Sequence, residues 1–415
     1  MSETESSIVS DNELYSFNKG GNGSCHILYD LANWKNGLAF KNIDFSPTGK
    51  PVIKIAELND GIGPTTAYTE KEYPKEVYLQ KGDFLFSWSG NPQTSIDIYK
   101  FQMQEGWLNQ HIFKVIPNEK LVHRDFFFYL MKALKPNFTK IATNKQTTGL
   151  GHVTVADLKR LEVTIPDYNK QKKIAQILLS LDDKIELNNA INRNLEEQAQ
   201  ALFKNWFADF APFGGKMPED WKLGKLGDVA EIKKKAFHPE KNPGLIVEHY
   251  SLPALDEKHY PVFEVADGIK SNKFVVSKES VLISKLNPDT KRIWRPYCIS
   301  ENPICSTEFV VFESINGSHR DFLYSIIDSQ QFYDFMGSLV TGCTNSHQRV
   351  SPETLLTFPI AIPPKTILKS FCDKITPIYE MIEKNVLENQ RLANLRDSTL
   401  PKLMSGEIDS DKIAV

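Results

Sequence analysis

The triplet His-Arg-Asp occurs twice in this chain, at residues 123–125 and again at residues 319–321. In protein kinases this triplet opens the catalytic loop, where the Asp acts as the base and an Asn five residues later binds a metal ion. Leu130 and Ile326 stand at the Asn positions here, and no GxGxxG loop follows an expected strand upstream. The sequence therefore excludes a kinase.

Each triplet is followed by an apolar run, which indicates the start of a helix. We expect the Asp of each triplet to cap its helix and the run to pack inward. The residues expected in the two cores are Phe126, Phe127, Tyr129 and Leu130 in the first helix and Phe322, Leu323, Ile326 and Ile327 in the second.

Other catalytic motifs are missing from the sequence. It contains no GKS or GKT phosphate loop, no GxSxG or HExxH motif, and neither DPPY nor NPPF, with which adenine methyltransferases hold a flipped base. The five cysteines form no CxxC pair and the nine histidines lack ligand spacing, which argues against a metal site or a disulfide framework. We expect a protein that binds, with no catalytic residue, metal or cofactor of its own.

Composition sets further bounds on the class of protein. The chain of 415 residues is 41% hydrophobic and 24% charged, as in soluble globular proteins of two or three domains. It has no apolar run long enough to span a membrane and starts with a polar, acidic stretch unlike a signal peptide, so we expect a cytoplasmic protein. The net charge of −3 means that any nucleic-acid role needs local basic patches or the charges of a partner.

The recurrence of the triplet is part of an internal duplication. The two triplets are 196 residues apart, and further pairs of segments recur at 196 or 197 residues. These pairs are NPQT 91–94 with NPDT 287–290, Phe113 and Val115 with Phe309 and Val311, and VTIP 163–166 with IAIP 360–363. The chain therefore consists of two copies of one unit, each a globular half followed by a helical segment.

The helical segments carry apolar residues at a mean spacing of 3.5, which is typical of a coiled-coil seam. We expect the first helix over residues 181–207, starting at Ser180, and the second from Pro377 to Pro401. The residues of the first seam are Leu181, Ile185, Asn188, Asn192 and Leu195, and those of the second are Ile378, Ile382, Asn385, Asn389 and Leu392.

Both seams carry asparagine at the same two positions, which fixes the register because each buried amide needs a polar partner. We predict that the helices pair antiparallel, with Asn188 near Asn389, Asn192 near Asn385, and a pseudo-twofold axis near Ala190 and Leu387. The alternative is that each helix packs only on its own globular half.

Polar loops at equivalent places in the two halves are the candidate binding surfaces, because Asn, Gln, Thr, Lys and Arg reach base edges and phosphates. The candidates of the first half are Trp88, Ser89, Asn91, Gln93, Thr94, Lys140, Asn144, Lys145, Gln146, Thr147 and Thr148. Those of the second half are Lys285, Asn287, Asp289, Lys291, Arg292, Arg295, Thr344, Asn345, His347, Gln348 and Arg349. The alternative is that these are solvated loops and that NPxT is a simple turn.

Helix length suggests a ligand for these loops. A helix of 27 residues is about 40 Å long, so two modules held that far apart match duplex DNA sites roughly one helical turn apart. The competing hypothesis is a duplicated, non-catalytic adaptor whose polar loops bind protein or glycan.

The order of these elements resembles the specificity subunit of type I restriction–modification systems. The resemblance covers nearly the whole chain, including GDFLFSWSGNPQTSI at 82–96, TTGLGHVTVADLKRLEVTIP at 147–166, PEDWKLGKLGDVAEI at 218–232 and LPKLMSGEI at 400–408. Residues 14–40 depart from the usual opening of the first recognition domain.

The resemblance implies an α/β (α+β) fold with two target-recognition domains joined by a pair of long antiparallel coiled-coil helices. The expected boundaries are 1–166 for the first recognition domain, 167–214 for the central helical spacer, 215–365 for the second recognition domain and 366–415 for the C-terminal helical spacer.

The same resemblance implies the partners and their chemistry. This subunit would read a bipartite target in double-stranded DNA and would not be catalytic. Two methyltransferase subunits would bind S-adenosylmethionine and methylate adenine, and two restriction subunits would use ATP and Mg²⁺.

Overall fold

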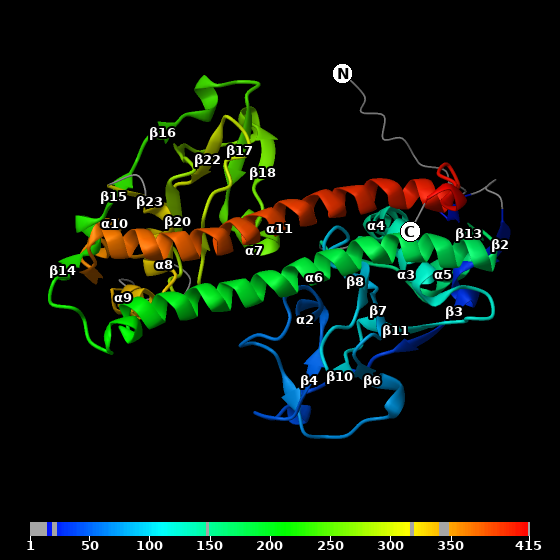
Figure 1. The fold of residues 1–415 in the computed structure, drawn as a ribbon. Coiled ribbons are helices and arrows are strands. Elements are labelled where there is room, and N and C mark those ends of the chain that lie inside the picture. The colour runs from blue at the N-terminus through cyan, green and yellow to red at the C-terminus, as the bar shows by residue number, and fades with distance from the viewer. Residues whose placement is uncertain (1–14, 19–22, 147–148, 316–318, 340–347, 414–415) are drawn as a thin grey trace, which may run out of the picture. The chain divides into compact units, whose positions relative to one another are not determined.

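The computed structural model describes residues 15–18, 23–146, 149–315, 319–339 and 348–413 (Figure 1). It divides into two compact units, which we call unit 1, Met1–Asp183 with Leu392–Val415, and unit 2, Lys184–Arg391. In the described residues, no helix is long and apolar enough to cross a membrane.

Unit 1 is built on antiparallel and mixed sheets with short helices beside them. One four-stranded sheet has the order β3-β11-β7-β9 and another the order β5-β4-β10-β6; smaller sheets have the orders β1-β13-β2 and β12-β8. The strands are β1 (Ser16–Phe17), β2 (Ser24–Ile27), β3 (Ala32–Asn36), β4 (Lys50–Ile53), β5 (Tyr68–Thr69), β6 (Tyr78–Gln80), β7 (Phe84–Ser87), β8 (Ser89–Gly90), β9 (Asp97–Lys100), β10 (Glu105–Leu108), β11 (Ile112–Pro117), β12 (Gly151–His152) and β13 (Glu162–Ile165). The short helices are α2 (Ile55–Asp60), α3 (Arg124–Ala133), α4 (Lys135–Asn144) and α5 (Val155–Arg160).

Unit 2 has a corresponding set of sheets, with the orders β15-β23-β20-β21, β16-β19-β22-β17-β18 and β14-β24. Its strands are β14 (Lys222–Lys225), β15 (Ala230–Lys233), β16 (Ala236–Phe237), β17 (Ile246–Tyr250), β18 (Val262–Val265), β19 (Lys273–Val275), β20 (Ser280–Ser284), β21 (Ile293–Trp294), β22 (Pro303–Ser306), β23 (Phe309–Ser314) and β24 (Pro359–Ile362). Its short helices are α7 (Leu252–Lys258), α8 (Arg320–Ile327), α9 (Gln330–Ser338) and α10 (Pro352–Leu355).

The shared strand order confirms the duplication. In both units the two inner strands of the corresponding four-stranded sheet pair antiparallel in the same register: Ser87 of β7 opposes Ile112 of β11 in unit 1, and Ser284 of β20 opposes Phe309 of β23 in unit 2. Both members of this pair are therefore offset by 197 residues. The predicted matches of Phe113 with Phe309 and of Val115 with Val311 at 196 were wrong by one residue, because Phe309 pairs with Ser284, the counterpart of Ser87, whereas Phe113 pairs with Phe86.

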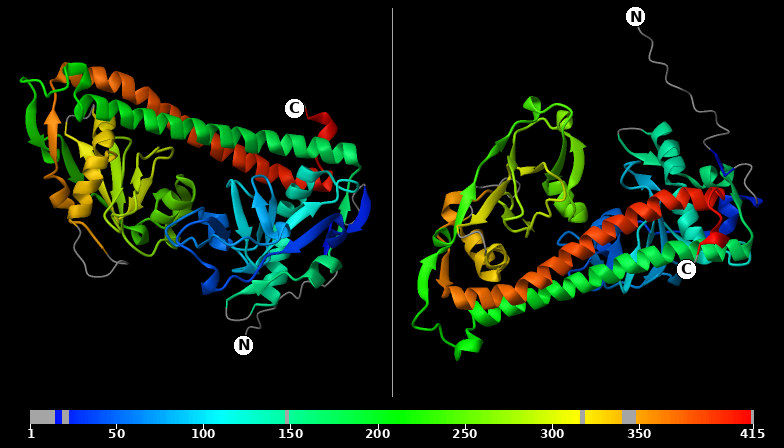
Figure 2. Two further views of the ribbon diagram at one scale, coloured as in Figure 1. Left: turned by 90° about the horizontal axis from the view of Figure 1, so that it is seen from below. Right: turned by 45° about the horizontal axis from the view of Figure 1, so that its top comes forward.

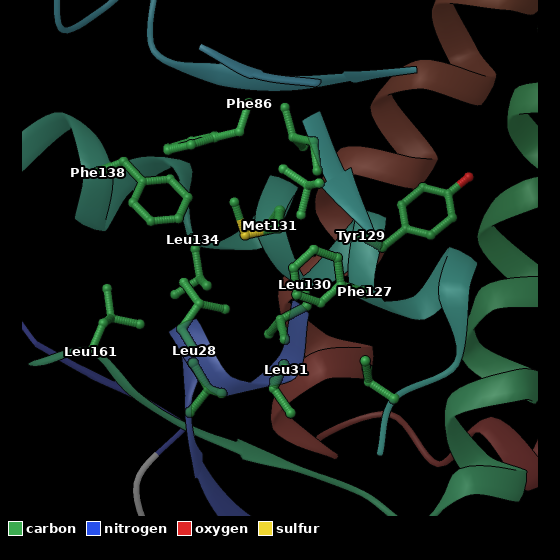
Figure 3. Packing of buried hydrophobic residues seen from close by; sticks show 14 of the residues in the cluster. Leu28, Leu31, Phe86, Phe127, Tyr129, Leu130, Met131, Leu134, Phe138 and Leu161 are labelled. Carbon is green, nitrogen blue, oxygen red and sulfur yellow. The ribbon is translucent and has the colours of Figure 1, made fainter. Parts of the chain in front are cut away.

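The apolar runs after the two His-Arg-Asp triplets are buried, as predicted. Figure 3 shows Phe127, Leu130 and Met131 of α3 in the same packed core as Leu28 and Leu31. The predicted capping role of the Asp was wrong. His123 and His319 occupy the N-cap positions without a side-chain cap bond, and the Asp of each triplet lies in the first turn, where a negative charge is favourable near the helix N-terminus.

The two long helices are longer than the seam indicated. Helix α6 (Tyr168–Phe207) has 40 residues and α11 (Lys365–Ser405) has 41. Helix α6 starts after Asp167, whose carboxylate accepts hydrogen bonds from the amides of Asn169 and Lys170. Ser180 is inside the helix and bonds to the Ile177 carbonyl, so the predicted start was wrong.

Two prolines lie inside α11 instead of marking its ends. An interior proline costs about 3 kcal/mol in a helix, and Pro377 is flanked by the buried Ile375 and Tyr379, whose packing in the unit 2 core offsets that cost. Pro401 is followed by the buried Leu403 and Met404 in the unit 1 core. The predicted boundaries at these prolines were wrong because burial outweighs local propensity.

Helices α6 and α11 pair antiparallel, and Figure 2 shows them running side by side. In unit 2, Asn188 Nδ2 donates to Asn389 Oδ1 at 2.9 Å and Asn385 Nδ2 donates to Asn192 Oδ1 at 2.8 Å. In unit 1, Arg396 Nη1 donates to Asp182 Oδ1 at 2.6 Å. Both predicted asparagine pairs are present.

The helices also pack on the sheets of the units, and the alternative that each helix packs only on its own globular half was wrong, because the helices pair and α11 contributes to both cores. The unit 1 core contains residues of both helices, namely Ile174, Ala175, Ile177, Leu178, Leu403 and Met404. The unit 2 core contains Ala199, Leu368, Phe371, Ile375 and Tyr379.

Candidate nucleic-acid interface

In each unit the strand β7 or β20 ends in a loop that is bonded to two other segments. In unit 1 the amide of Trp88 donates to the His111 carbonyl at 3.3 Å, and the amide of Val153 donates to the Trp88 carbonyl at 2.9 Å. Residue 89 then pairs with residue 152 as β8 meets β12. We call Trp88, His111 and His152 the unit 1 junction.

The side chains of the unit 1 junction form an aromatic cluster. The ring centroid of Trp88 lies 5.6 Å from that of His111 and 5.9 Å from that of His152. Its Nε1 donates to Asn36 Oδ1 at 3.3 Å, and Gln110 Nε2 lies 3.1 Å from His111 Nε2. All three junction residues are partly exposed.

Burial and the neighbouring His152 lower the pKa of His111, so its imidazole is neutral at pH 7. Within the described residues, the Nδ1 atoms of both His111 and His152 are buried without a hydrogen-bond partner. A neutral imidazole both donates and accepts, and an indole ring offers a stacking face. The exposed parts of these three rings can therefore contact a polar aromatic ligand such as a base, chiefly by stacking.

The corresponding loop of unit 2 has the same backbone bonds. The amide of Lys285 donates to the Glu308 carbonyl at 3.0 Å, and the amide of Val350 donates to the Lys285 carbonyl at 3.1 Å. Leu286 forms an antiparallel β-bridge with Arg349, in the same way that Ser89 pairs with His152 in unit 1. We call Lys285, Glu308 and Arg349 the unit 2 junction.

The unit 2 junction is charged where the unit 1 junction is aromatic. Arg349 Nη2 lies 3.1 Å from Glu308 Oε1, and the Arg349 side chain is 55% exposed. The second carboxylate oxygen, Glu308 Oε2, is buried with no partner in the part of the chain that the structure describes. Arginine reads guanine and carboxylates accept from cytosine in the major groove, so this group can also contact bases.

The NPxT segments are turns that follow the junctions. Asn91 Oδ1 accepts hydrogen bonds from the amides of Gln93 and Thr94, whose side chains are exposed. Asn287 has a φ of +50°, and its amide donates to the Gln348 carbonyl at 3.0 Å. Ser89 is buried in β8 and Asp289 is exposed.

Other predicted residues of unit 1 lie in α4 and just after it. Lys140, Asn144 and Gln146 are exposed there, and Lys145 forms an ion pair with the buried Asp157. Burial raises the pKa of Asp157, but hydrogen bonds from Lys145 and Thr154 outweigh burial and hold that pKa below its usual range.

Three predicted basic residues of unit 2 are paired with carboxylates. Lys291 contacts Asp328 at 2.5 Å, and Arg292 binds both oxygens of Asp256. Arg295, whose side chain is 12% exposed, binds Asp321 at 2.8 Å and Glu383 at 2.7 Å. These contacts give Arg295 a structural role. The predicted residues Thr147, Thr148, Thr344, Asn345 and His347 lie outside the described residues.

Sequence reasoning missed His111, His152 and Glu308. Each lies beside a predicted residue in space and far from it in sequence. Extending the offset of 197 residues from Trp88 and Lys285 along the two halves would have aligned His111 with Glu308 and His152 with Arg349. No group of three or more His, Cys, Asp or Glu side chains in the described ranges could hold a metal ion.

The structure thus consists of two units of related sheet topology with an antiparallel helix pair and with polar, partly exposed loops at corresponding places. The family model of the type I restriction modification DNA specificity domain matches residues 27–197 and 218–394. The chain belongs to this family. It is the specificity subunit of a type I restriction–modification system, which recognises the DNA target and is not itself catalytic.

Curated relatives match along nearly their whole length. The chain is 26% identical to the type I restriction enzyme MjaIX specificity subunit of Methanocaldococcus jannaschii, with 92% of this chain and 98% of the relative covered. It is also 26% identical to the HindI specificity subunit of Haemophilus influenzae, with 80% and 87% covered.

A solved structure shares the fold. The S subunit of a type I restriction–modification system from M. genitalium matches with a TM-score of 0.55 at 15% identity, covering 93% of this chain and 97% of that one. As part of a type I complex, the chain has DNA and modification and restriction subunits as its partners.

Proposed function

We propose that unit 1 and unit 2 each read one part of a bipartite DNA target, and that the helix pair sets the number of base pairs between the parts. The observation that carries this proposal is the combination of one strand order in both units with an antiparallel register centred on the pairs Asn188–Asn389 and Asn192–Asn385. A duplicated reader with a fixed helical connection suits two half-sites at a fixed distance.

The proposed recognition domains are residues 1–166 and 215–365, with helical spacers at 167–214 and 366–415. The candidate DNA contacts are the exposed residues of the two junctions and of the loops beside them. Because the net charge is −3, partner subunits would supply much of the contact with phosphate.

The proposed complex contains two methyltransferase subunits and two restriction subunits around one copy of this chain, and it acts in the cytosol. The methyltransferase subunits would bind S-adenosylmethionine and methylate adenine. ATP and Mg²⁺ would be used by the restriction subunits. This chain would hold none of these cofactors.

Sequencing of methylated DNA from cells that express the chain with its methyltransferase tests the proposal. We expect one split motif. Exchanging residues 1–166 for the recognition domain of another specificity subunit should change one half of the motif and leave the other half intact. A change in both halves would contradict modular readout.

The spacer role has a separate test. Inserting seven residues after Ala190 and seven after Leu387 keeps both the 3.5-residue seam and the antiparallel register. The insertion lengthens each helix by about 10 Å, which should lengthen the tolerated spacer by about three base pairs. An unchanged spacer would show that the length of the helices does not set the number of base pairs between the half-sites.

A further inference from the structure

The two junctions occupy the same place in one backbone framework. Four features match between the units at an offset of 197 residues: the strand register at Ser87 and Ser284, the two backbone bonds of residue 88 or 285, and the pairing of residue 89 with 152 or 286 with 349. Residues at these positions therefore correspond in three dimensions as well as in sequence.

The side chains at these corresponding positions differ in chemical type. Trp88 corresponds to Lys285, His111 to Glu308 and His152 to Arg349. The strands beneath them keep similar residues: Leu85 and Phe86 correspond to Leu282 and Ile283, all of which are fully buried. The core therefore constrains its own positions, while the three junction positions differ in charge, size and aromatic character.

This contrast is expected of positions that read different sequences. Two units that share a fold and bind different half-sites need a few partly exposed positions on which base contacts can change without disturbing the core. The junction side chains are partly or largely exposed, and the backbone bonds that hold them do not depend on their identity.

Both junctions also retain polar atoms without a partner in the described part of the protein. In unit 1 these are the Nδ1 atoms of His111 and His152, and in unit 2 the Oε2 atom of Glu308. A buried polar atom without a hydrogen bond is unfavourable. Because these atoms are buried, a base would contact the exposed parts of the same side chains, which are partly exposed.

We propose that these three positions determine specificity in each unit: Trp88, His111 and His152 read one half of the target, and Lys285, Glu308 and Arg349 read the other. The inference rests on the proposed bipartite function and names the residues that perform it. It predicts a polar and stacking mode of readout in unit 1 and a charged mode in unit 2.

The test uses the full chain in complex with its methyltransferase, with the methylated motif as the readout. Arg349→Ala should relax the choice of base at one or two adjacent positions of one half-site, with a loss of discrimination of about tenfold or more. His152→Ala should relax the other half-site. Lys241→Ala and Lys75→Ala are matched controls, because both are exposed lysines outside the junctions, and the motif should not change.

Arg349→Lys separates a base contact from a phosphate contact. Lysine keeps the positive charge but lacks the planar guanidinium that binds guanine through two hydrogen bonds. We expect Arg349→Lys to relax the same positions as Arg349→Ala. A motif identical to that of the wild type with Arg349→Lys would assign the residue to phosphate binding and overturn the proposal.

The remaining outcomes are also distinguishable. If the wild-type complex gives no split motif, the proposed function itself fails. If the wild type gives the motif and the junction variants leave it unchanged, only this inference fails. For a variant that abolishes methylation, binding of the purified complex to a library with one randomised half-site decides: relaxed choice in that half supports the proposal, whereas a uniform loss of binding or a lowered unfolding temperature overturns it.

Discussion

Units 1 and 2 hold the long helices through the same positions but with different side chains. In unit 1 the Tyr129 hydroxyl donates to Asp182 Oδ2 at 2.6 Å, and Arg396 binds the other oxygen. In unit 2 the corresponding positions are Ser325 and Tyr379, whose hydroxyl oxygens lie 2.9 Å apart. The tyrosine lies on the globular half in unit 1 and on the helix in unit 2, and both units have a polar contact at this place.

Unit 2 adds an ionic contact between its globular half and its helix. Arg295 binds Asp321 on α8 and Glu383 on α11, and Thr376 also donates to Asp321 at 2.7 Å. At the corresponding place in unit 1, Asp125 lies 3.9 Å from its neighbour Arg124 and has a more exposed side chain. A duplicated fold therefore preserves the place where two elements meet. The side chains that make the contact can change, provided that buried polar groups remain paired.

The strongest test of this difference removes Asp321. We expect Asp321→Ala to reduce the stability of unit 2 by about 3 kcal/mol, because it leaves a largely buried guanidinium with one carboxylate fewer. Hydrogen–deuterium exchange of peptides from α8 and from α3 measures the change unit by unit.

Asp125→Ala is the matched control in unit 1. Its carboxylate is more exposed and, among the residues that the structure describes, contacts Arg124 at the long distance of 3.9 Å, so the expected effect is less than about 1 kcal/mol. Equal effects of the two substitutions would show that the difference between the units is not energetic.

A second prediction concerns the part of the helix pair that unit 2 contains. Asn188→Ala should cost about 1 to 2 kcal/mol, because it leaves the amide of Asn389 with one partner fewer in a largely buried seam. A double-mutant cycle on Asn188 and Asn389 should give a coupling of about 1 kcal/mol.

The control cycle pairs Asn389 with Asn194. Asn194 is an exposed residue of α6, the helix that also contains Asn188, and its side chain bonds to Gln198. No coupling is expected there. A coupling of the same size in both cycles would mean that the helix responds as a whole and that the asparagine pair is not specific.

The smallest predicted effect is a dependence of stability on pH that differs between the units. Burial lowers the pKa of His111 in unit 1 and of His249 in unit 2. Folding therefore favours the neutral imidazoles. Their contribution is fully present above the unfolded-state pKa of about 6.5 and is lost as pH falls through the lower folded-state value.

Unfolding midpoints at pH 7.5 and 5.5 measure this dependence. The His249 residue is 8% exposed whereas His111 is only half-buried, so His249→Gln should remove more of the pH dependence than His111→Gln. The reverse order would show that the neighbouring Glu264, which bonds to His249 at 2.7 Å, outweighs burial.

Patterns that repeat along the chain predicted the fold well. The 3.5-residue seam and its asparagines indicated the antiparallel pair, and the recurrence at 196 and 197 residues indicated two units with one topology. Both signals are local or periodic, so they are readable without knowing what packs against them.

Periodic patterns did not predict where the helices begin and end, or which single side chains are free to contact a ligand. Ser180, Pro377 and Pro401 carry local signals for helix ends, yet all three lie inside helices that are stabilised by burial on a sheet unit. Arg295 was predicted as a DNA contact, but in the structure it is paired with two carboxylates that are 26 and 88 residues away in sequence.

The sequence alone thus determined the duplication and the pairing of the two long helices, because periodicity and repetition are properties of the chain, whereas the recognition role followed from the resemblance to the specificity-subunit family. Only the tertiary structure decided which residues meet at each junction. Trp88, His111 and His152 are brought together by the pairing of β7 with β11 and of β8 with β12, and no local pattern encodes contacts between strands so far apart in sequence.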